Sequence, residues 1–258
     1  MSETTPKIRI RGLYKSFGNK LVLDGVDLDV MPGTSMVVIG GSGSGKSVLL
    51  KCVLGLLEPD DGLIEIDGVN LARLPRQERE EMRARIGMLF QNGALFDSLS
   101  VWENVAFGLL ARRKLPRAEA RARANSFLEQ VGLAASVGDL SPAELSGGMQ
   151  KRVALARAIA AHPDIMFFDE PTTGLDPIMG AVIDGLIVDC VKSLGSTAVA
   201  ITHDMASARR IGDQAAMLHH GRIIWHGPAS HLMDSGNPEV DQFTHGRREG
   251  PIQMELRR

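Results

Sequence analysis

Long apolar runs are absent from this sequence. Nowhere do about 18 apolar residues follow one another, which is the length that a membrane-spanning helix needs. The first residues, Met1-Ser2-Glu3-Thr4-Thr5, also lack the basic region and apolar core of a secretory signal. We therefore expect a soluble chain that stays in the cytoplasm.

Cysteine and excess charge are also scarce. The two cysteines, Cys52 and Cys190, lie inside apolar helical patterns, which argues against a disulfide framework and for buried small hydrophobes. Charged residues make up 23% of the chain and the net charge is −2, so the composition gives no support to a nucleic-acid binder. No internal repeat or low-complexity segment is present. At 258 residues, the chain is long enough for one α/β domain with a substantial core.

A glycine-rich turn between an apolar run (36–39) and a helical pattern (48–54) is the most informative stretch. A strand, such a turn and a helix form the context of a phosphate-binding loop, whose backbone N–H groups point at a polyphosphate. We expect the Lys46 ammonium to neutralise the β- and γ-phosphates and the Ser47 hydroxyl to hold Mg²⁺. The predicted nucleotide-binding loop comprises Gly40, Gly41, Ser42, Gly43, Ser44, Gly45, Lys46 and Ser47.

Alternating strand and helix patterns predict an α/β fold with a mostly parallel core sheet. Residues 8–14 and 63–68 alternate in hydropathy and suggest a small antiparallel sheet, with another strand region over 21–30 that breaks near Gly25. From Asn92 to about Ala161 the pattern is helical, which predicts an inserted helical subdomain.

Polar residues follow three of the apolar strand patterns, namely Gln91, Asp169 and His203. In parallel sheets ligands bind at the carboxyl ends of strands, so these residues outline a site. Asp169 would supply a carboxylate for Mg²⁺. Glu170, one residue further, would polarise a water aimed at the γ-phosphate, help that is typically worth about 10²–10⁴-fold in rate.

A second anion site is predicted where Leu145 to Arg152 begins a helix. Ser146 would cap this helix, and Gly147 and Gly148 would expose backbone N–H groups at its positive end. The chain then has two helix N-termini suited to anions, one after the phosphate loop and one at Ser146. Either the two termini bind different anions, or two copies of the chain share one nucleotide.

In these motifs and their order, the sequence resembles the ATP-binding subunits of ABC transporters over nearly its whole length. The matching motifs are the phosphate loop, Gln91 (Q-loop), Leu145–Gln150 (signature), Phe167–Glu170 (Walker B), Thr173–Asp176 (D-loop) and His203 (H-loop). The resemblance implies a P-loop NTPase of ABC type in one domain over 1–258. Its parts would be a RecA-like core at about 1–91 and 162–243, a helical subdomain at about 92–161 and a C-terminal extension at about 244–258.

The resemblance also implies roles for single residues. Two protomers would pair head to tail, with each ATP between the phosphate loop of one and Ser146, Gly147, Gly148 and Gln150 of the other. Phe17 stands where the family stacks an aromatic on adenine, and Tyr14 is the competing candidate. Glu170 would be the catalytic base and His203 the γ-phosphate switch, while Asp176 belongs to the D-loop. The implied Mg²⁺ ligands are Ser47, Gln91 and Asp169.

Within that family, the sequence resembles the ATPases of MCE-associated lipid transporters, of the Mla and Mkl type. The matching residues are 91–96, 98–105, Met149, 171–180, 242–243 and 250–251. This implies movement of phospholipids between the inner membrane and the outer envelope. The ATPase would lie on the cytoplasmic side of the inner membrane with a permease, a periplasmic MCE protein and a small STAS-domain partner. The alternatives are a cell-division ATPase that transmits force without transport, and the ATPase of another importer, such as one for amino acids.

Two surfaces are predicted to meet partners. The helical subdomain would carry the groove that receives the permease, with Phe96, Leu99, Val101 and Val105 as apolar candidates to line it. The alternative is that these residues simply pack the subdomain. In the tail, Ile252, Met254 and Leu256 alternate between arginine pairs, although the composition alone favours a disordered end. We expect residues 246–258 to hold the opposite subunit.

Overall fold

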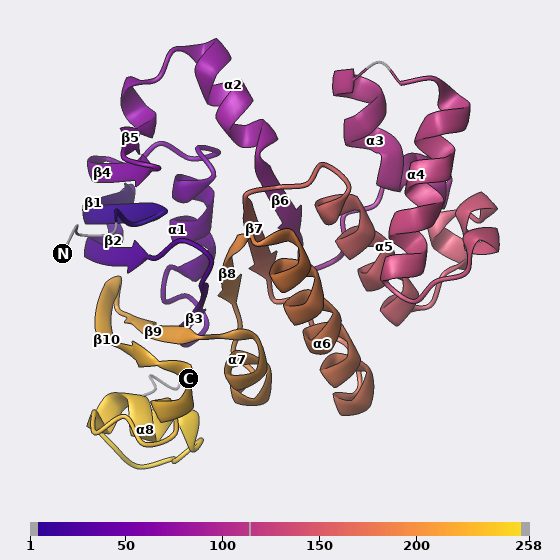
Figure 1. Ribbon diagram of the computed structural model, residues 1–258. Coiled ribbons are helices and arrows are strands. Elements are labelled where there is room, and N and C mark those ends of the chain that lie inside the picture. Colours follow the sequence, from indigo (N-terminus) through magenta and orange to yellow (C-terminus); the bar gives the residue numbers. More distant parts are fainter. Residues whose placement is uncertain (1–4, 114, 254–258) are drawn as a thin grey trace. The chain divides into compact units, whose positions relative to one another are not determined.

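The computed structural model describes residues 5–113 and 115–253 (Figure 1). The chain divides into two compact units. The first unit joins Met1–Leu74 with Ala200–Arg258, and the second is Pro75–Val199. Among the helices of the described residues, none combines the length and the hydrophobicity that crossing a membrane requires.

An antiparallel sheet in the first unit has the strand order β2-β1-β4-β5. Its strands are β1 (Ile8–Phe17), β2 (Lys20–Val30), β4 (Asp61–Ile66) and β5 (Val69–Asn70). Every second residue in the first part of β1 is buried, as alternating hydropathy dictates for a sheet with one covered face. The small antiparallel sheet predicted from the early strands is confirmed.

The expected break near Gly25 is wrong, because β2 continues through it as a bulge. Leu13 pairs with Val26 and Tyr14 with Asp24, which leaves Gly25 without a partner in the ladder. Gly25 has φ +72°, and a Cβ there would lie 2.9 Å from the Tyr14 hydroxyl oxygen. A glycine at this position therefore bends the strand and makes room for the tyrosine ring.

The rest of the first unit surrounds a short buried strand. All residues of β3 (Ser35–Ile39) are buried, and β3 runs parallel to β9 (Gln214–His219). β9 in turn pairs antiparallel with β10 (Arg222–Pro228). The helices of this unit are α1 (Lys46–Val53), α7 (Met205–Ile211) and α8 (Pro238–Thr244), with 3₁₀ turns at Leu71–Arg73 and Ala229–His231.

The second unit contains a parallel strand pair and most of the helices. β6 (Ile86–Leu89) pairs parallel with β7 (Ile165–Asp169), and α2 (Arg76–Ala84) and α6 (Pro177–Leu194) belong to the same unit. Three further helices pack on one another (Figure 1): α3 (Val101–Arg113), α4 (Arg117–Gln130) and α5 (Gly147–Ile159), with 3₁₀ turns at Ala135–Asp139 and Pro142–Glu144. The boundary between the units falls within β8 (Thr197–Ile201). Strand and helix elements with parallel pairing confirm the predicted α/β class.

Both cysteines are buried and free, as predicted. Burial raises the pKa of the Cys52 thiol to about 11 and that of the Cys190 thiol to about 11. Because the thiolate is the reactive form, neither residue is suited to nucleophilic or redox chemistry at neutral pH.

Candidate nucleotide site

A glycine-rich loop joins the buried strand β3 to helix α1 in the first unit. The loop curls because Gly40, Gly43 and Gly45 adopt φ +153°, +76° and +108°. At Gly45, a Cβ would stand 2.9 Å from the Val22 carbonyl oxygen, and at Gly40 it would collide with the Leu218 carbonyl. The loop can follow this path only with glycines, and it leads its backbone N–H groups to the start of α1.

Lys46 and Ser44 are buried in this loop. The Lys46 Nζ donates to the carbonyl oxygens of Gly40 at 2.7 Å and Gly41 at 3.0 Å, so its ammonium lies across the loop. The Ser44 Oγ is buried without a hydrogen-bond partner, whereas Ser47 is exposed at the first turn of α1. A cation and an exposed hydroxyl at a helix N-terminus suit a polyphosphate with a bound divalent cation.

A cavity of about 300 Å³ adjoins the loop in the first unit. It is lined by Phe17, Lys20, Val22 and the segment 43–48. The Phe17 ring is 50% exposed at the end of β1, so a flat ligand can reach its face beside the phosphate loop. The structure thus brings Phe17 and the phosphate loop to one pocket.

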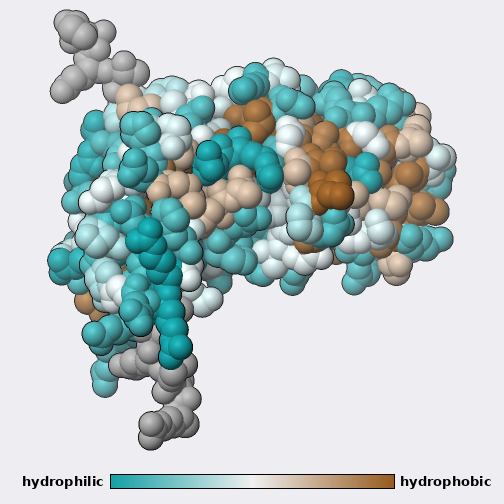
Figure 2. Space-filling model, turned by 90° about the horizontal axis from the view of Figure 1, so that it is seen from below, coloured by the Kyte–Doolittle hydropathy of each residue, from teal (hydrophilic) through white to brown (hydrophobic). Residues whose placement is uncertain are grey.

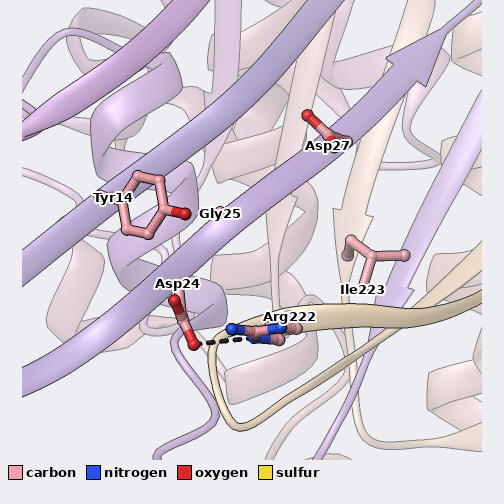
Figure 3. Close-up of a pocket in the computed structure, with 6 residues that line it drawn as sticks. All are labelled: Tyr14, Asp24, Gly25, Asp27, Arg222 and Ile223. Atoms are coloured by element: carbon pink, nitrogen blue, oxygen red, sulfur yellow. Dashed lines mark hydrogen bonds and ion pairs between the residues drawn. The ribbon is translucent and has the colours of Figure 1, made fainter.

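Tyr14, the competing aromatic, lies in a different pocket of the same unit (Figure 3). Its neighbours there are Asp24, Gly25, Asp27, Arg222 and Ile223. The Arg222 Nε donates to an Asp24 carboxylate oxygen at 2.7 Å across this pocket. Its lining is polar and contains none of the phosphate-loop residues, so the geometry favours Phe17 as the aromatic neighbour of a nucleotide.

His203 follows β8 in the first unit. Its neighbour Thr202 is buried and donates its N–H to the Val38 carbonyl oxygen at 3.4 Å, which holds this strand end beside β3. The Asp204 carboxylate then caps α7 by accepting from the N–H of Ala206 at 2.7 Å. The His203 side chain is exposed between these two anchors, next to the strand that leads into the phosphate loop.

The acidic pair predicted for catalysis lies in the second unit, where the buried strand β7 ends at Asp169. Glu170 has φ +48°, in the left-handed region that residues other than glycine rarely occupy. The Thr173 hydroxyl donates to the Glu170 Oε2 at 3.3 Å. Such strained backbone persists only where surrounding contacts hold it and is concentrated at functional sites.

The D-loop and the signature segment meet in the same unit. The Asp176 carboxylate caps α6 by accepting from the N–H groups of Ile178 and Met179, both at 3.0 Å. The Met179 side chain packs against Gly148 of the signature segment. A Cβ on Gly148 would lie 3.0 Å from the Met179 Cγ. The N-terminus of α5 therefore packs directly on the segment that follows the D-loop.

Two signature residues, Ser146 and Gln150, make different hydrogen bonds within their own chain. Ser146 caps α5, as predicted, with its Oγ accepting from the Met149 N–H at 3.3 Å. The Gln150 side chain instead turns back and donates to the Pro142 carbonyl oxygen at 3.0 Å. Ser146 and Gly147 are exposed, so the backbone N–H groups at this helix end face solvent.

Gln91 stands directly after Phe90 at the carboxyl end of β6, with an exposed side chain. Its carbonyl oxygen accepts from the Lys151 Nζ. Burial lowers the pKa of Lys151, while the charges of Asp169 and Glu170 act in the opposite direction. The sequence pattern does not predict this buried position of Lys151, since a lysine inside a helix pattern is normally a surface residue.

Several large apolar side chains are exposed, and the face in Figure 2 shows hydrophobic patches between hydrophilic residues. In the helical subdomain Phe96 and Phe107 are 43% and 46% exposed, with ring centroids 4.7 Å apart. Val101 and Val105 are 0% and 1% exposed, so their expected place in a surface groove is wrong. One turn apart on α3, they face the helical core instead.

The loop that carries Phe96 is held by the fully buried Asn104. Its amide donates to the carbonyl oxygens of Phe96, Leu99 and Ser100, each at 3.1 Å. Its Oδ1 accepts from the Phe96 N–H at 2.7 Å. Asn104 thereby satisfies the loop's backbone groups and fixes the exposed ring.

Comparison with known proteins agrees with this arrangement. Residues 23–173 match the family described as ABC transporter. The chain is 41% identical over 247 residues to the probable ribonucleotide transport ATP-binding protein mkl of Mycobacterium leprae, covering 96% of this chain and 71% of that protein. It is 40% identical over 245 residues to the intermembrane phospholipid transport system ATP-binding protein MlaF of Escherichia coli K12, covering 95% of this chain and 91% of MlaF.

A solved structure is also similar. It is a dimeric ATP-binding cassette in a post-hydrolysis state with ADP and Pi, and it matches with a TM-score of 0.79 and 32% identity over 86% of this chain and 98% of that one. The fold and the phosphate loop thus define a P-loop ATPase cassette. This chain belongs to the ABC transporter family, as an ATP-binding subunit that hydrolyses ATP.

Proposed function

We propose that this ATPase drives phospholipids through a membrane permease, between the inner membrane and the outer envelope. The supporting observation is the 40% identity with MlaF, which extends over 95% of this chain and 91% of MlaF. An alignment of that length covers parts of the ATPase core and of the helical segment alike. The Mycobacterium leprae relative bears a different substrate in its name, ribonucleotides, which makes the substrate the point to test.

The proposed site is shared by two copies of the chain. The phosphate loop, Phe17 and His203 bind one ATP, with Asp169 and Glu170 at its γ-phosphate. The N–H groups of Gly147 and Gly148 and the Ser146 hydroxyl approach that ATP from the partner copy, because they stand at a helix N-terminus where Ser146 and Gly147 are exposed. Gln150 supports this segment through its bond to Pro142, and Asp176 shapes the adjoining D-loop.

The three residues proposed as Mg²⁺ ligands carry donors of the kind that the ion prefers. The Ser47 hydroxyl, the Gln91 amide oxygen and the Asp169 carboxylate are the hard oxygen ligands that Mg²⁺ prefers. In the described part of the chain, no cluster of three or more histidine, cysteine or acidic side chains could hold a metal alone. A nucleotide-bound Mg²⁺ needs no such cluster, since phosphates and water complete its shell. When bound, the ion would neutralise charge on the β- and γ-phosphates.

We propose that the exposed Phe96–Phe107 pair marks the docking surface for the permease. Arg157 lies 5.9 Å from the Phe96 ring centroid and adds a cation beside the aromatic pair. An aromatic patch with a flanking arginine has the composition of interface hot spots. The permease would place the chain at the cytoplasmic face of the inner membrane, and a periplasmic MCE protein and a STAS-domain protein would complete the complex.

Reconstitution tests the proposed substrate. The complex that co-purifies with this chain from membranes is placed in liposomes with a fluorescent phospholipid. We expect ATP-dependent movement of the phospholipid, and no movement with Glu170→Gln in the ATPase. Stimulation of ATP turnover by a ribonucleotide or an amino acid, without movement of phospholipid, would contradict the proposal. Recovery of a division protein in place of a permease would do so as well.

Phe17 provides a test of adenine stacking. Phe17→Ala should raise the Kd for ATP by roughly 5- to 150-fold, because stacking a base on an aromatic ring is worth about 1–3 kcal/mol. Tyr14→Ala is the matched control, since Tyr14 faces another pocket, and it should leave the Kd unchanged. Isothermal titration calorimetry on both variants measures this. A larger rise in the Kd for ATP with Tyr14→Ala than with Phe17→Ala would make Tyr14 the residue that stacks on adenine.

The first residues of the tail (246–258) are bound to helix α8 through Gln242. The Gln242 side chain, 7% exposed, accepts from the Ile252 N–H at 2.7 Å and donates to the Ile252 carbonyl oxygen at 3.1 Å. An amide that pairs with both backbone groups of one residue mimics a strand partner. Ile252 is therefore tied back to α8, whereas Met254 and Leu256 lie outside the described residues. The hold of residues 246–258 on the opposite subunit stays a prediction.

Deleting residues 246–258 should weaken retention of the partner subunit or of the dimer during purification, while the Kd for ATP stays within about twofold. Size-exclusion chromatography across a salt series measures retention. Gln242→Ala, which removes only the anchor, should show the same trend to a smaller degree. Equal dimer and partner retention in the truncated and full chains would assign the tail no part in assembly.

A further inference from the structure

Helix α5 packs unusually closely on the strand that leads to Gln91. A Cβ on Gly87, in β6, would lie 2.6 Å from the Ala158 carbonyl oxygen and 2.9 Å from the Pro163 ring. Only glycine allows this approach, which brings the last residues of β6 against the helix. The Q-loop turn (residues 91–94) therefore leaves the sheet directly beside α5.

Two cations of α5 then hold the carbonyl groups of this turn. Lys151 donates to the Gln91 carbonyl oxygen, and Arg157 donates to those of Gly93 and Ala94, both at 2.7 Å. Gly93 and Ala94 have φ +70° and +49°, so the turn is of the left-handed kind that leaves its carbonyls without ladder partners. The turn is bound to the helix by charge-assisted hydrogen bonds, which are stronger than neutral ones.

Lys151 lies near the N-terminus of α5, whereas Arg157 lies in its last turn. Lys151 is four residues from Gly147, hence one turn away on the same face of α5. Its side chain is 6% exposed, and the charges of Asp169 and Glu170 reach it. One ammonium thus binds the Q-loop backbone from a position one helical turn after Gly147, and it lies within the electrostatic reach of the acidic pair at the end of β7, all within the second unit.

We infer that Lys151 is a positioning residue for ATP hydrolysis, which fixes the Gln91 backbone to the signature helix. This inference rests on the proposed roles of Gln91 and of the signature segment. When α5 closes on the phosphates of the partner's ATP, the Lys151 bond carries that movement to the residue that contacts the chain's own ATP. Arg157 anchors the far end of the same turn.

The first test compares Lys151→Met, which keeps the length of the side chain but loses the charge, with Lys192→Met on the exposed last turn of α6. We expect kcat to fall at least about tenfold in Lys151→Met, since misplacing catalytic groups by about 1 Å costs on the order of 10²-fold. The Kd for ATP should stay within about twofold, because the phosphate loop is in the other unit. Lys192→Met should change neither value.

Lys151→Arg and a double-mutant cycle separate positioning from stability. Lys151→Arg restores a cationic donor and should recover most of kcat, even if Lys151→Met lowers the melting temperature. Lys151→Met and Gln91→Ala should be non-additive, with the double variant no worse than the poorer single one. Additive losses, a parallel rise in Kd, or no rescue by arginine would overturn the inference. If Gln91→Ala itself leaves kcat unchanged, the proposed role of Gln91 fails, and the inference falls with it.

Discussion

Glu170→Gln should bind ATP and fail to hydrolyse it, with turnover reduced by about 10²–10⁴-fold, the typical value of a positioned general base. The amide keeps the size of the carboxylate but cannot accept the proton of an attacking water. Glu170 stands one residue beyond the buried strand β7, at φ +48°, and its Oε2 accepts from Thr173. The variant should accumulate as an ATP-bound dimer.

Steady-state phosphate release and light scattering with and without ATP measure both effects. Glu129→Gln, on the exposed face of α4, is the matched control and should hydrolyse ATP normally. If Glu170→Gln hydrolysed ATP within about threefold of the rate of the unmodified protein, Glu170 would not be the general base, because a positioned base contributes far more than threefold.

Ser146→Arg should leave ATP binding to the single chain intact and abolish hydrolysis in the dimer, by at least about 10²-fold. The bulky cation would occupy the end of α5, where Ser146 and Gly147 are exposed and where the partner's phosphate is proposed to bind. Loss of the helix cap is a smaller effect, worth about 1 kcal/mol of stability.

Two controls isolate the cause of the loss. Ser146→Ala removes the cap to the Met149 N–H without adding bulk, so it should retain more activity than the arginine variant. Ser126→Arg places the same side chain on the exposed face of α4 and should be neutral. Hydrolysis at the unmodified rate by Ser146→Arg in the assembled transporter would disprove a shared site.

The sequence predicted the parts of the fold that local patterns determine. The sequence pattern predicts helices over 101–113 and 177–194 and a strand over 197–201, and α3, α6 and β8 have these bounds. Asp176 and Gly195 delimit α6. The phosphate loop was also predictable, because its glycines are required by the backbone itself. Phe17 and the phosphate loop lie at one pocket as their motifs suggest.

Long-range contacts decided what the sequence could not predict. Gly25 looked like a break, yet pairing with β1 carries the strand through it as a bulge. Val101 and Val105 looked like groove residues, yet packing among α3, α4 and α5 buries them. No sequence pattern shows which backbone groups Lys151, Asn104 and Gln242 bind, and only the fold reveals them.

Complementation between two inactive variants tests the shared ATP site most directly. Lys46→Ala disables the phosphate loop, and Ser146→Arg disables the signature, so each homodimer should be inactive. In a mixed dimer, the phosphate loop of the Ser146→Arg chain faces the intact signature of the Lys46→Ala chain. An equimolar mixture should therefore regain up to about a quarter of the active sites. ATP hydrolysis no higher than that of the separate variants would show that each site is built from one chain.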